Sequence, residues 1–234
     1  MLNSTRPFWI VLESPKKTIP ITSALFADLQ QRKGHQGPVQ FAEPREQCLR
    51  ELNKNFEEKG EKVMKERAGL VTMRGNPLTL VGNEVRMGER APDFVALDPD
   101  LTPIKLSSYM GKICIISSVP SLDTPVCDME TRKFNEEASK LGDKIRIITI
   151  SMDLPFAQKR WCGAAGVNKI QTLSDHRDAQ FGLAYGVLIK ELRLLARTVF
   201  LVDQKGILQY MQLVKEIANE PNYEEIWSAL KKFL

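Results

Sequence analysis

The residues best suited to chemistry lie in the stretch Ser117–Arg132, which reads SSVPSLDTPVCDMETR. An apolar run, Ile113–Ile116, leads into a short polar turn, and Thr124 and Pro125 then open a helical pattern. Threonine is a common N-cap residue, and proline suits the first helical position because its missing N–H would have no partner there. Cys127 therefore falls in the first helical turn, where free backbone N–H groups and the helix dipole favour a thiolate.

A thiolate is the form of cysteine that attacks other atoms, so Cys127 is a candidate nucleophile. The other interpretation is that Cys127 is a small apolar residue at the start of a core helix. The pattern of strand, turn, cysteine and helix leaves both interpretations open.

The composition narrows the class of protein. The chain has 234 residues, 43% hydrophobic and 26% charged, which is typical of one globular domain with an appendage. The net charge of +4 is small and arises mostly in residues 1–72, so the composition gives no support for a nucleic-acid partner. No apolar run approaches the ~18–20 residues of a membrane span. We therefore expect a cytoplasmic protein with neither a membrane nor a nucleic acid as partner.

The cysteine pattern argues against a disulfide framework, because the four cysteines are few and unevenly spaced for a chain of this length. Cys114 lies inside an apolar run and is expected in the core. Cys48 lies near the apolar stripe of a predicted helix, where a packing role is expected. The sequence has no C-x-x-C pair and no histidine at metal-ligand spacing from a cysteine, so we expect neither a zinc site nor a cofactor.

The chain divides into an N-terminal extension, residues 1–72, and a domain, residues 73–234. The extension begins with a loose leader over residues 1–44. Residues 45–68 then carry an apolar stripe at helical spacing, with Glu and Lys on the other faces, and predict an amphipathic helix.

In the domain, the β-branched runs Ile113–Ser118 and Ile145–Ser151 predict buried strands, with a helix over Cys127–Leu141 between them. Such a unit implies a parallel pair with a right-handed crossover. The remaining predicted elements are strands at Leu78–Val81 and Phe94–Leu97, a helical turn at Leu106–Met110, a helix from an Asp153 N-cap to Gly163–Gly166, a helix at Asp178–Tyr185, a hairpin of Thr198–Asp203 with Leu208–Val214, and a helix at Tyr223–Phe233. This α/β pattern, a mixed sheet of about five strands with helices on both faces, resembles the thioredoxin-like fold.

Four stretches carry a family resemblance. The spacing Pro120-x-x-x-Thr124-x-x-Cys127 resembles the active site of the peroxiredoxins, and the full string PSLDTPVC is similar to their thiol peroxidase branch. The stretches Asp153–Gly163, Thr172–Val187 and Leu195–Asp203 agree with that branch in the same order. The resemblance covers the domain, whereas the extension, Cys48 and Cys114 lie outside the family pattern.

The resemblance implies that the Cys127 thiolate attacks a hydroperoxide and becomes a sulfenic acid. It also implies that Cys162 resolves this acid to an intrachain disulfide, that a thioredoxin-like reductant restores both thiols, and that the protein is a homodimer. Because both cysteines lie in predicted helices, closure of the disulfide is expected to need local unwinding, which Gly163 and Gly166 would ease. The other interpretation of Cys162 is a buried cysteine.

Activation of a thiol at a helix terminus is not sufficient for this reaction. Lowering a thiol pKa from ~8.5 to ~6 raises the thiolate fraction about 30-fold, but the weaker nucleophile loses about tenfold. The resemblance assigns the orientation of the peroxide to Arg197 and Thr124, and the exclusion of water to Pro120. The alternatives are a surface ion pair for Arg197 and a helix cap alone for Thr124. Arg132, beyond the first helical turn, is left outside the predicted site.

Two further questions remain open in the sequence. Phe156 and Trp161 form either an apolar rim that favours bulky lipid hydroperoxides or ordinary core. The alternatives to a peroxidase are a general thiol–disulfide oxidoreductase and a non-catalytic peroxide sensor on the same fold. The missing C-x-x-C pair disfavours the oxidoreductase.

Overall fold

The computed structural model describes residues 64–233. Cys48 and most of the helix predicted over residues 45–68 lie outside the described residues. The last residues predicted for that helix, Glu66–Ala68, lie instead in strand β1 (Glu66–Met73). Strand β1 pairs with β2 (Asn76–Val81), so the expected boundary between residues 72 and 73 falls inside a hairpin.

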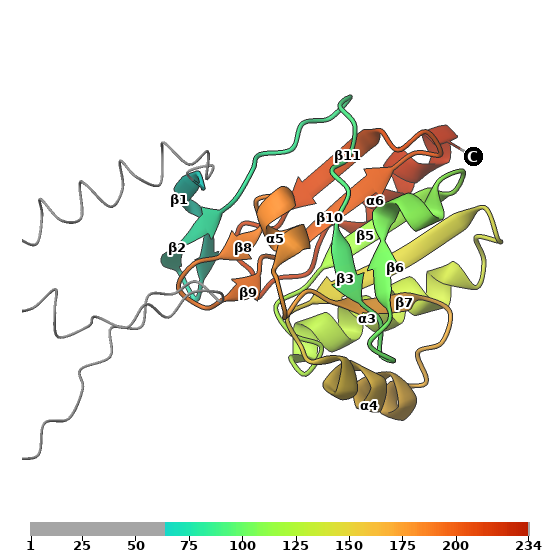
Figure 1. The fold of residues 1–234 in the computed structure, drawn as a ribbon, viewed down its shortest axis with the longest axis horizontal. Helices are drawn as coiled ribbons and strands as arrows, with labels where there is room; N and C mark the ends of the chain where they lie inside the picture. The colour runs from blue at the N-terminus through green and yellow to red at the C-terminus, as the bar shows by residue number, and fades with distance from the viewer. Residues whose placement is uncertain (1–63, 234) are drawn as a thin grey trace, which may run out of the picture. The chain divides into compact units, whose positions relative to one another are not determined.

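The central layer is a seven-stranded mixed sheet in the order β11-β10-β5-β6-β7-β3-β4 (Figure 1). Its strands are β3 (Val95–Leu97), β4 (Pro103–Lys105), β5 (Ile113–Ser118), β6 (Ile145–Ser151), β7 (Gln171–Ser174), β10 (Thr198–Val202) and β11 (Leu208–Leu213). The predicted parallel pairing of β5 with β6 and the antiparallel pairing of β10 with β11 are confirmed. The sheet is wider than the five strands expected, because β4 and β7, of three and four residues, are too short to show a periodic pattern.

A second sheet has the order β1-β2-β8-β9, with β8 at Leu188–Ile189 and β9 at Leu194–Leu195. The hairpin between β1 and β2 turns at Arg74 and Gly75, whose φ angles of 53° and 78° suit a tight two-residue turn. The backbone of Thr72 hydrogen-bonds to Lys215 and Ile217 at 2.7 and 2.9 Å. The hairpin therefore holds the segment that follows β11.

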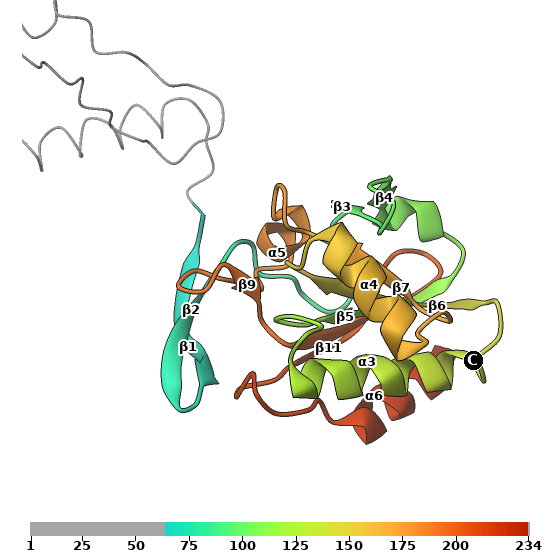
Figure 2. The ribbon, with the colours of Figure 1, turned by 90° about the horizontal axis from the view of Figure 1, so that it is seen from below.

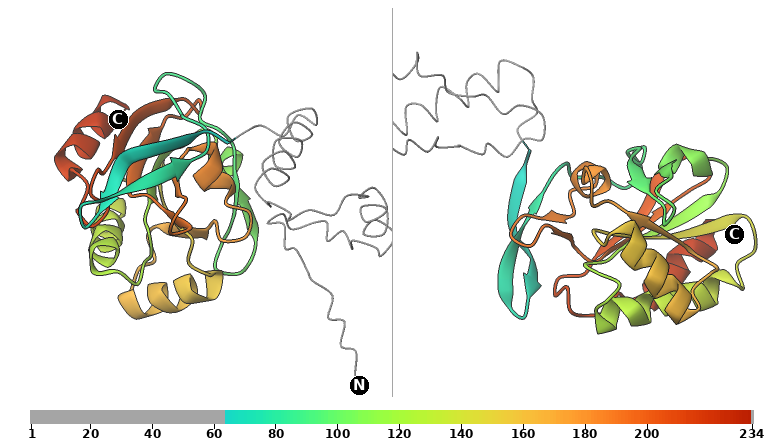
Figure 3. Two further views of the ribbon diagram at one scale, coloured as in Figure 1. Left: turned by 90° about the vertical axis from the view of Figure 1, so that its left-hand side faces the viewer. Right: turned by 60° about the horizontal axis from the view of Figure 1, so that its bottom comes forward.

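Helices cover both faces of the central sheet, as predicted. Helices α3 (Pro125–Ala138), α4 (Pro155–Ala165) and α6 (Tyr223–Leu230) pack on one face, and Figures 2 and 3 show them gathered there. The short α5 (Gln180–Ala184) packs on the opposite face with the second sheet. Along β5, Ile113 and Ile115 face the three helices, whereas Cys114 and Ile116 face the other cluster.

Several predicted helix ends differ from the structure. Helix α4 has Leu154, not Asp153, as its N-cap, because the Asp153 side chain bonds elsewhere. Helix α5 is shorter than the predicted Asp178–Tyr185, because the buried carboxylate of Asp175 takes the N–H groups of Phe181 and Gly182. Short 3-10 helices occupy Leu106–Tyr109 and Lys231–Phe233. No helix within residues 64–233 is long and apolar enough to cross a membrane.

Candidate active site

The topology of the sheet brings Cys127 and Arg197 together. Strand β5 ends at Ser118 and leads through a short loop into α3, which places Cys127 at the carboxyl edge of the strand. Strand β10 runs antiparallel to β5, and its first residue, Thr198, pairs with Ser118. Arg197 therefore enters the sheet at the edge where Cys127 leaves it, although 70 residues separate them in sequence.

The Cys127 sulfur is fully buried, at the edge of the apolar cluster beneath the helices, and has two polar partners. The residue has no exposed surface, and Arg197 is 1% exposed. The Nη2 atom of Arg197 lies 3.2 Å from Cys127 Sγ, and Thr124 Oγ1 lies 2.7 Å from it. The guanidinium and the hydroxyl are both hydrogen-bond donors, so this buried sulfur has two polar partners within hydrogen-bond distance.

Thr124 occupies the N-cap position of α3, as predicted, but its side chain makes no capping hydrogen bond. Its hydroxyl lies between Cys127 Sγ and the Ser121 carbonyl oxygen, which is 3.0 Å away. One hydroxyl hydrogen can serve only one of these acceptors at a time. When the sulfur is a thiolate, the hydroxyl can donate to it.

Arg197 is fixed by two further contacts. Its Nη1 donates to the buried carboxylate of Glu130, and its Nε donates to the Ile217 carbonyl oxygen at 3.0 Å. Ser117 Oγ donates to the other Glu130 oxygen at 2.6 Å. Burial alone would lower the pKa of Arg197, but the adjacent Glu130 and Cys127 raise it, so the guanidinium stays charged. The surface ion pair considered for Arg197 is wrong, because the pair is buried.

Glu130 is the counter-charge of this pair. Burial raises its pKa, while Arg197 and the Ser117 hydroxyl act in the opposite direction. Glu130 lies three residues after Cys127 on the same face of α3, so helical spacing could have indicated that it faces the site. Sequence reasoning missed it because its partner, Arg197, comes from a distant strand.

Asp153 anchors the loop that precedes Cys127. Its carboxylate accepts hydrogen bonds from Ser121 Oγ at 2.7 Å, the Leu122 N–H at 2.8 Å and Ser151 Oγ at 2.7 Å. The aspartate itself lies just before α4. One side chain therefore fixes both the loop that leads to Thr124 and the entry to the helix that carries Cys162.

Cys162 lies apart from this cluster. It sits seven residues after Pro155 in α4, roughly 10 Å along the helix axis from the edge where Cys127 lies. Its sulfur is 3.5 Å from Thr172 Oγ1 on β7. Cys114, Cys127 and Cys162 are all free thiols, so among the described cysteines the structure holds no bridge.

The other predicted residues fall in different environments. Pro120 is buried in the loop before Cys127. Arg132 is exposed, bonds to Asp128 and to the Ala165 carbonyl oxygen, and makes no recorded contact with the Cys127 sulfur. Phe156 is 65% exposed, whereas Trp161 is buried with its indole N–H on Asp128. Of the two aromatics, only Phe156 is free to contribute to a surface rim.

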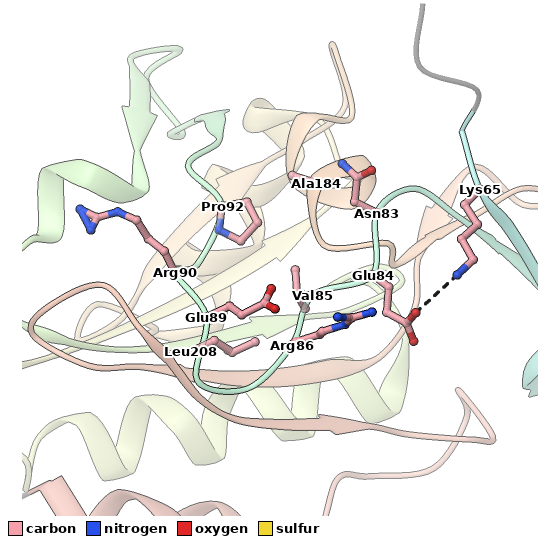
Figure 4. Close-up of a pocket in the computed structure, with 10 residues that line it drawn as sticks. All are labelled: Lys65, Asn83, Glu84, Val85, Arg86, Glu89, Arg90, Pro92, Ala184 and Leu208. Atoms are coloured by element: carbon pink, nitrogen blue, oxygen red, sulfur yellow. Dashed lines mark ion pairs between the residues drawn. The ribbon is translucent and has the colours of Figure 1, made fainter.

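A separate pocket of about 420 Å³ lies along the segment between β2 and β3 (Figure 4). It is lined by charged side chains of both signs, and Lys65 Nζ pairs with Glu84 Oε2 at 3.6 Å. None of the residues around Cys127 lines it. Within residues 64–233, no group of three or more His, Cys, Asp or Glu side chains could hold a metal ion.

Comparisons with known proteins agree with this geometry. The family model described as Redoxin matches residues 86–226. A thiol peroxidase of Bacillus subtilis is 56% identical over 161 residues, which cover 69% of this chain and 96% of that protein. A thiol peroxidase of Listeria monocytogenes is 54% identical over 162 residues, covering 69% of this chain and 98% of that one.

Solved structures agree as well. A peroxiredoxin-like protein from Aquifex aeolicus, 42% identical, superposes with a TM-score of 0.67 over 73% of this chain and 99% of its own. A thiol peroxidase from Chromobacterium violaceum, at 21% identity and a TM-score of 0.62, shares the fold over 69% of this chain and 95% of its own. The site has a buried cysteine in the first turn of a helix, with an arginine and a threonine in contact with its sulfur. In agreement with these comparisons, the chain belongs to the redoxin family and, within it, to the thiol peroxidases.

Proposed function

We propose that this thiol peroxidase reduces hydroperoxides at Cys127 and closes each turnover by a disulfide with Cys162. The observation that carries the proposal is the position of the Cys127 sulfur, fully buried between the Thr124 hydroxyl and the Arg197 guanidinium. No other described cysteine has a charged hydrogen-bond partner in the part of the chain that the structure covers.

In the first step, the Cys127 thiolate attacks one oxygen of the hydroperoxide, the O–O bond breaks, and the second oxygen leaves as water or an alcohol after protonation. Arg197 is suited to this step because Nη2 carries a second N–H besides the one directed at sulfur. That N–H can donate to a peroxide oxygen beside the sulfur. The Arg197 guanidinium, which Glu130 and Ile217 hold in place, can then stabilise the negative charge that develops on the leaving oxygen.

In the second step, the Cys162 thiol condenses with the sulfenic acid. The two sulfurs join, the S–O bond breaks, and the hydroxyl leaves with the thiol proton as water. Since α3 and α4 are both formed around the reduced cysteines, we expect the ends of one or both helices to unwind before the sulfurs meet. Gly166, the left-handed C-cap of α4, and the exposed Gly163 support opening on the Cys162 side.

The remaining parts of the proposal concern partners and location. A thioredoxin-like dithiol is proposed to reduce the disulfide by exchange, and a homodimer and a cytoplasmic location are proposed from the family resemblance and the free thiols. Sedimentation of the reduced full chain tests the dimer.

The test of the cycle combines turnover with peptide mapping. The full chain is expected to consume hydrogen peroxide in a thioredoxin-coupled assay, and the oxidised protein is expected to yield a Cys127–Cys162 disulfide peptide under non-reducing conditions. The matched variant Cys162→Ser should accept one equivalent of peroxide and then stop. A bridge through Cys48 or between chains, or full turnover by Cys162→Ser, would contradict the proposed resolving step.

A further inference from the structure

The surroundings of Cys162 hold a feature that the peroxidase cycle does not use. Ser117, Thr149 and Thr172 are paired in register across β5, β6 and β7. Residues paired in this way point to the same face of a sheet. Ser117 bonds to Glu130 of α3, and Thr172 contacts Cys162 of α4, so this hydroxyl row lies beneath the two helices.

The two cysteine-bearing helices contact different strands of this hydroxyl row. The Cys127 cluster is tied to β5 through Glu130 and Ser117, whereas the Cys162 sulfur is tied to β7 through Thr172. Neighbouring strands are ~4.8 Å apart, so these two attachment points are separated by roughly 10 Å. In the reduced structure the Cys162 sulfur contacts Thr172 and is not bonded to Cys127. We therefore expect Cys162 to leave Thr172 when the disulfide forms.

The contact with Thr172 belongs to the resting state alone. Thr172 is buried, and Oγ1 is within hydrogen-bond distance of the Cys162 sulfur. Burial raises the pKa of Cys162 and the Thr172 contact acts in the opposite direction, so the net shift favours the thiol, which can donate to Oγ1 or accept from it. Two charged side chains of α3 contact this part of α4. Asp128 accepts from the Trp161 indole N–H, and Arg132 donates to the Ala165 carbonyl oxygen, so both are directed at groups other than the Cys162 sulfur. An interaction made in the ground state and broken on the way to reaction slows the reaction.

We propose that Thr172 is a positioning residue that holds the Cys162 thiol in a resting site over β7 and thereby slows formation of the disulfide. This inference deepens the proposed function and rests on Cys162 as the resolving residue. The consequence is a longer life for the Cys127 sulfenic acid, and with it a larger chance that a second hydroperoxide oxidises it to the sulfinic acid.

The test uses three single variants of the full chain. Thr172→Val keeps the shape and removes the hydroxyl, whereas Thr172→Ser keeps the hydroxyl and removes a methyl group. Thr149→Val is the matched control. It is the same substitution on the neighbouring strand β6, at a hydroxyl that has no partner among the described residues. Circular dichroism and thermal unfolding establish that each variant folds.

The first measurement is the rate at which an alkylating reagent labels Cys162 in reduced protein without peroxide. We expect Thr172→Val to label about fivefold faster than the parent, the size of one lost hydrogen bond, and the other two variants to match the parent. If loosened packing were the cause, Thr172→Ser would label fastest. That order, or an unchanged rate in Thr172→Val, would overturn the proposal.

The second measurement is the rate of disulfide formation after one equivalent of peroxide. Thr172→Val should form the Cys127–Cys162 bridge faster, with Cys127 oxidation itself unchanged. In a separate treatment with excess peroxide, which supplies the second equivalent that oxidation of the sulfenic acid requires, Thr172→Val should give less sulfinic acid. A slower bridge in Thr172→Val would also overturn the proposal. Because the labelling assay needs no peroxide, it decides on the resting site even where the proposed cycle fails.

Discussion

Two buried cysteines lie on opposite faces of the central sheet, and we expect them to differ in reactivity. Cys127 follows β5 on the helix face and has no exposed surface, and Cys114 points to the opposite face with 2% exposed. Both cysteines belong to apolar clusters, but Cys127 also contacts a guanidinium and a hydroxyl, whereas burial raises the pKa of Cys114 to about 11. Burial is therefore common to both cysteines, and the polar partners distinguish the one that we propose to react.

The largest expected effect comes from the sulfur itself. Cys127→Ser should abolish peroxide consumption, because a hydroxyl is not ionised near neutral pH and cannot form a sulfenic acid. Cys114→Ala is the matched control on the other face, and it should retain the parental rate. A coupled peroxidase assay of both variants tests this difference between the two cysteines. Equal loss of activity in the two variants would contradict it.

Removal of the cation comes next. Arg197→Met should lower kcat/KM for peroxide by about 10²–10³, the usual cost of losing a donor aimed at developing charge. It should also destabilise the fold by about 3–5 kcal/mol, because the buried Glu130 carboxylate loses its partner.

The double variant Arg197→Met/Glu130→Met separates the two effects. It should recover most of the stability in urea unfolding, because no buried charge remains unpaired, and still lack activity. Recovered activity in the double variant would show that Arg197 serves the fold and not the reaction.

A smaller effect is expected from the anchor of the loop. Asp153→Asn keeps the size of the side chain but lowers its ability to accept from Ser121, Leu122 and Ser151. The loop should then hold Thr124 less well over the sulfur, with kcat/KM lower by about tenfold. Stopped-flow oxidation of Cys127 measures this directly. Asp175→Asn changes a buried carboxylate on the other face and should leave that rate unchanged.

The smallest effect concerns the pH dependence of Cys114. With a pKa raised to about 11, only about one Cys114 in a thousand is a thiolate at pH 8, and this fraction rises tenfold per pH unit. Native protein should therefore resist alkylation at Cys114 at pH 8, and unfolding in urea should expose the thiol to rapid labelling. Rapid labelling of Cys114 in the folded protein would remove the contrast between the two faces.

Much of this site was predictable from sequence because its parts are local. The Thr124–Cys127 turn follows from a proline and a threonine at a helix start, and the strands β5 and β6 follow from their β-branched runs. Long apolar runs and helix starts are set by neighbouring residues, so local sequence carries them.

The rest depends on contacts between distant residues. The roles of Glu130 and Ile217 on Arg197, and of Asp153 on the loop, come from pairs that only the folded sheet brings together. The error at Asp153 has the same origin, because a residue typical of a helix cap found better partners across the edge of the sheet.

We infer that polar partners, and not burial, select Cys127 for reaction with peroxide. The most direct test treats the reduced Cys162→Ser protein with one equivalent of hydrogen peroxide in the presence of a sulfenic-acid trap and quantifies the adduct at each cysteine. We predict an adduct at Cys127 approaching one per chain and none at Cys114. An adduct at Cys114 comparable to that at Cys127, or no adduct at Cys127, would contradict the claim.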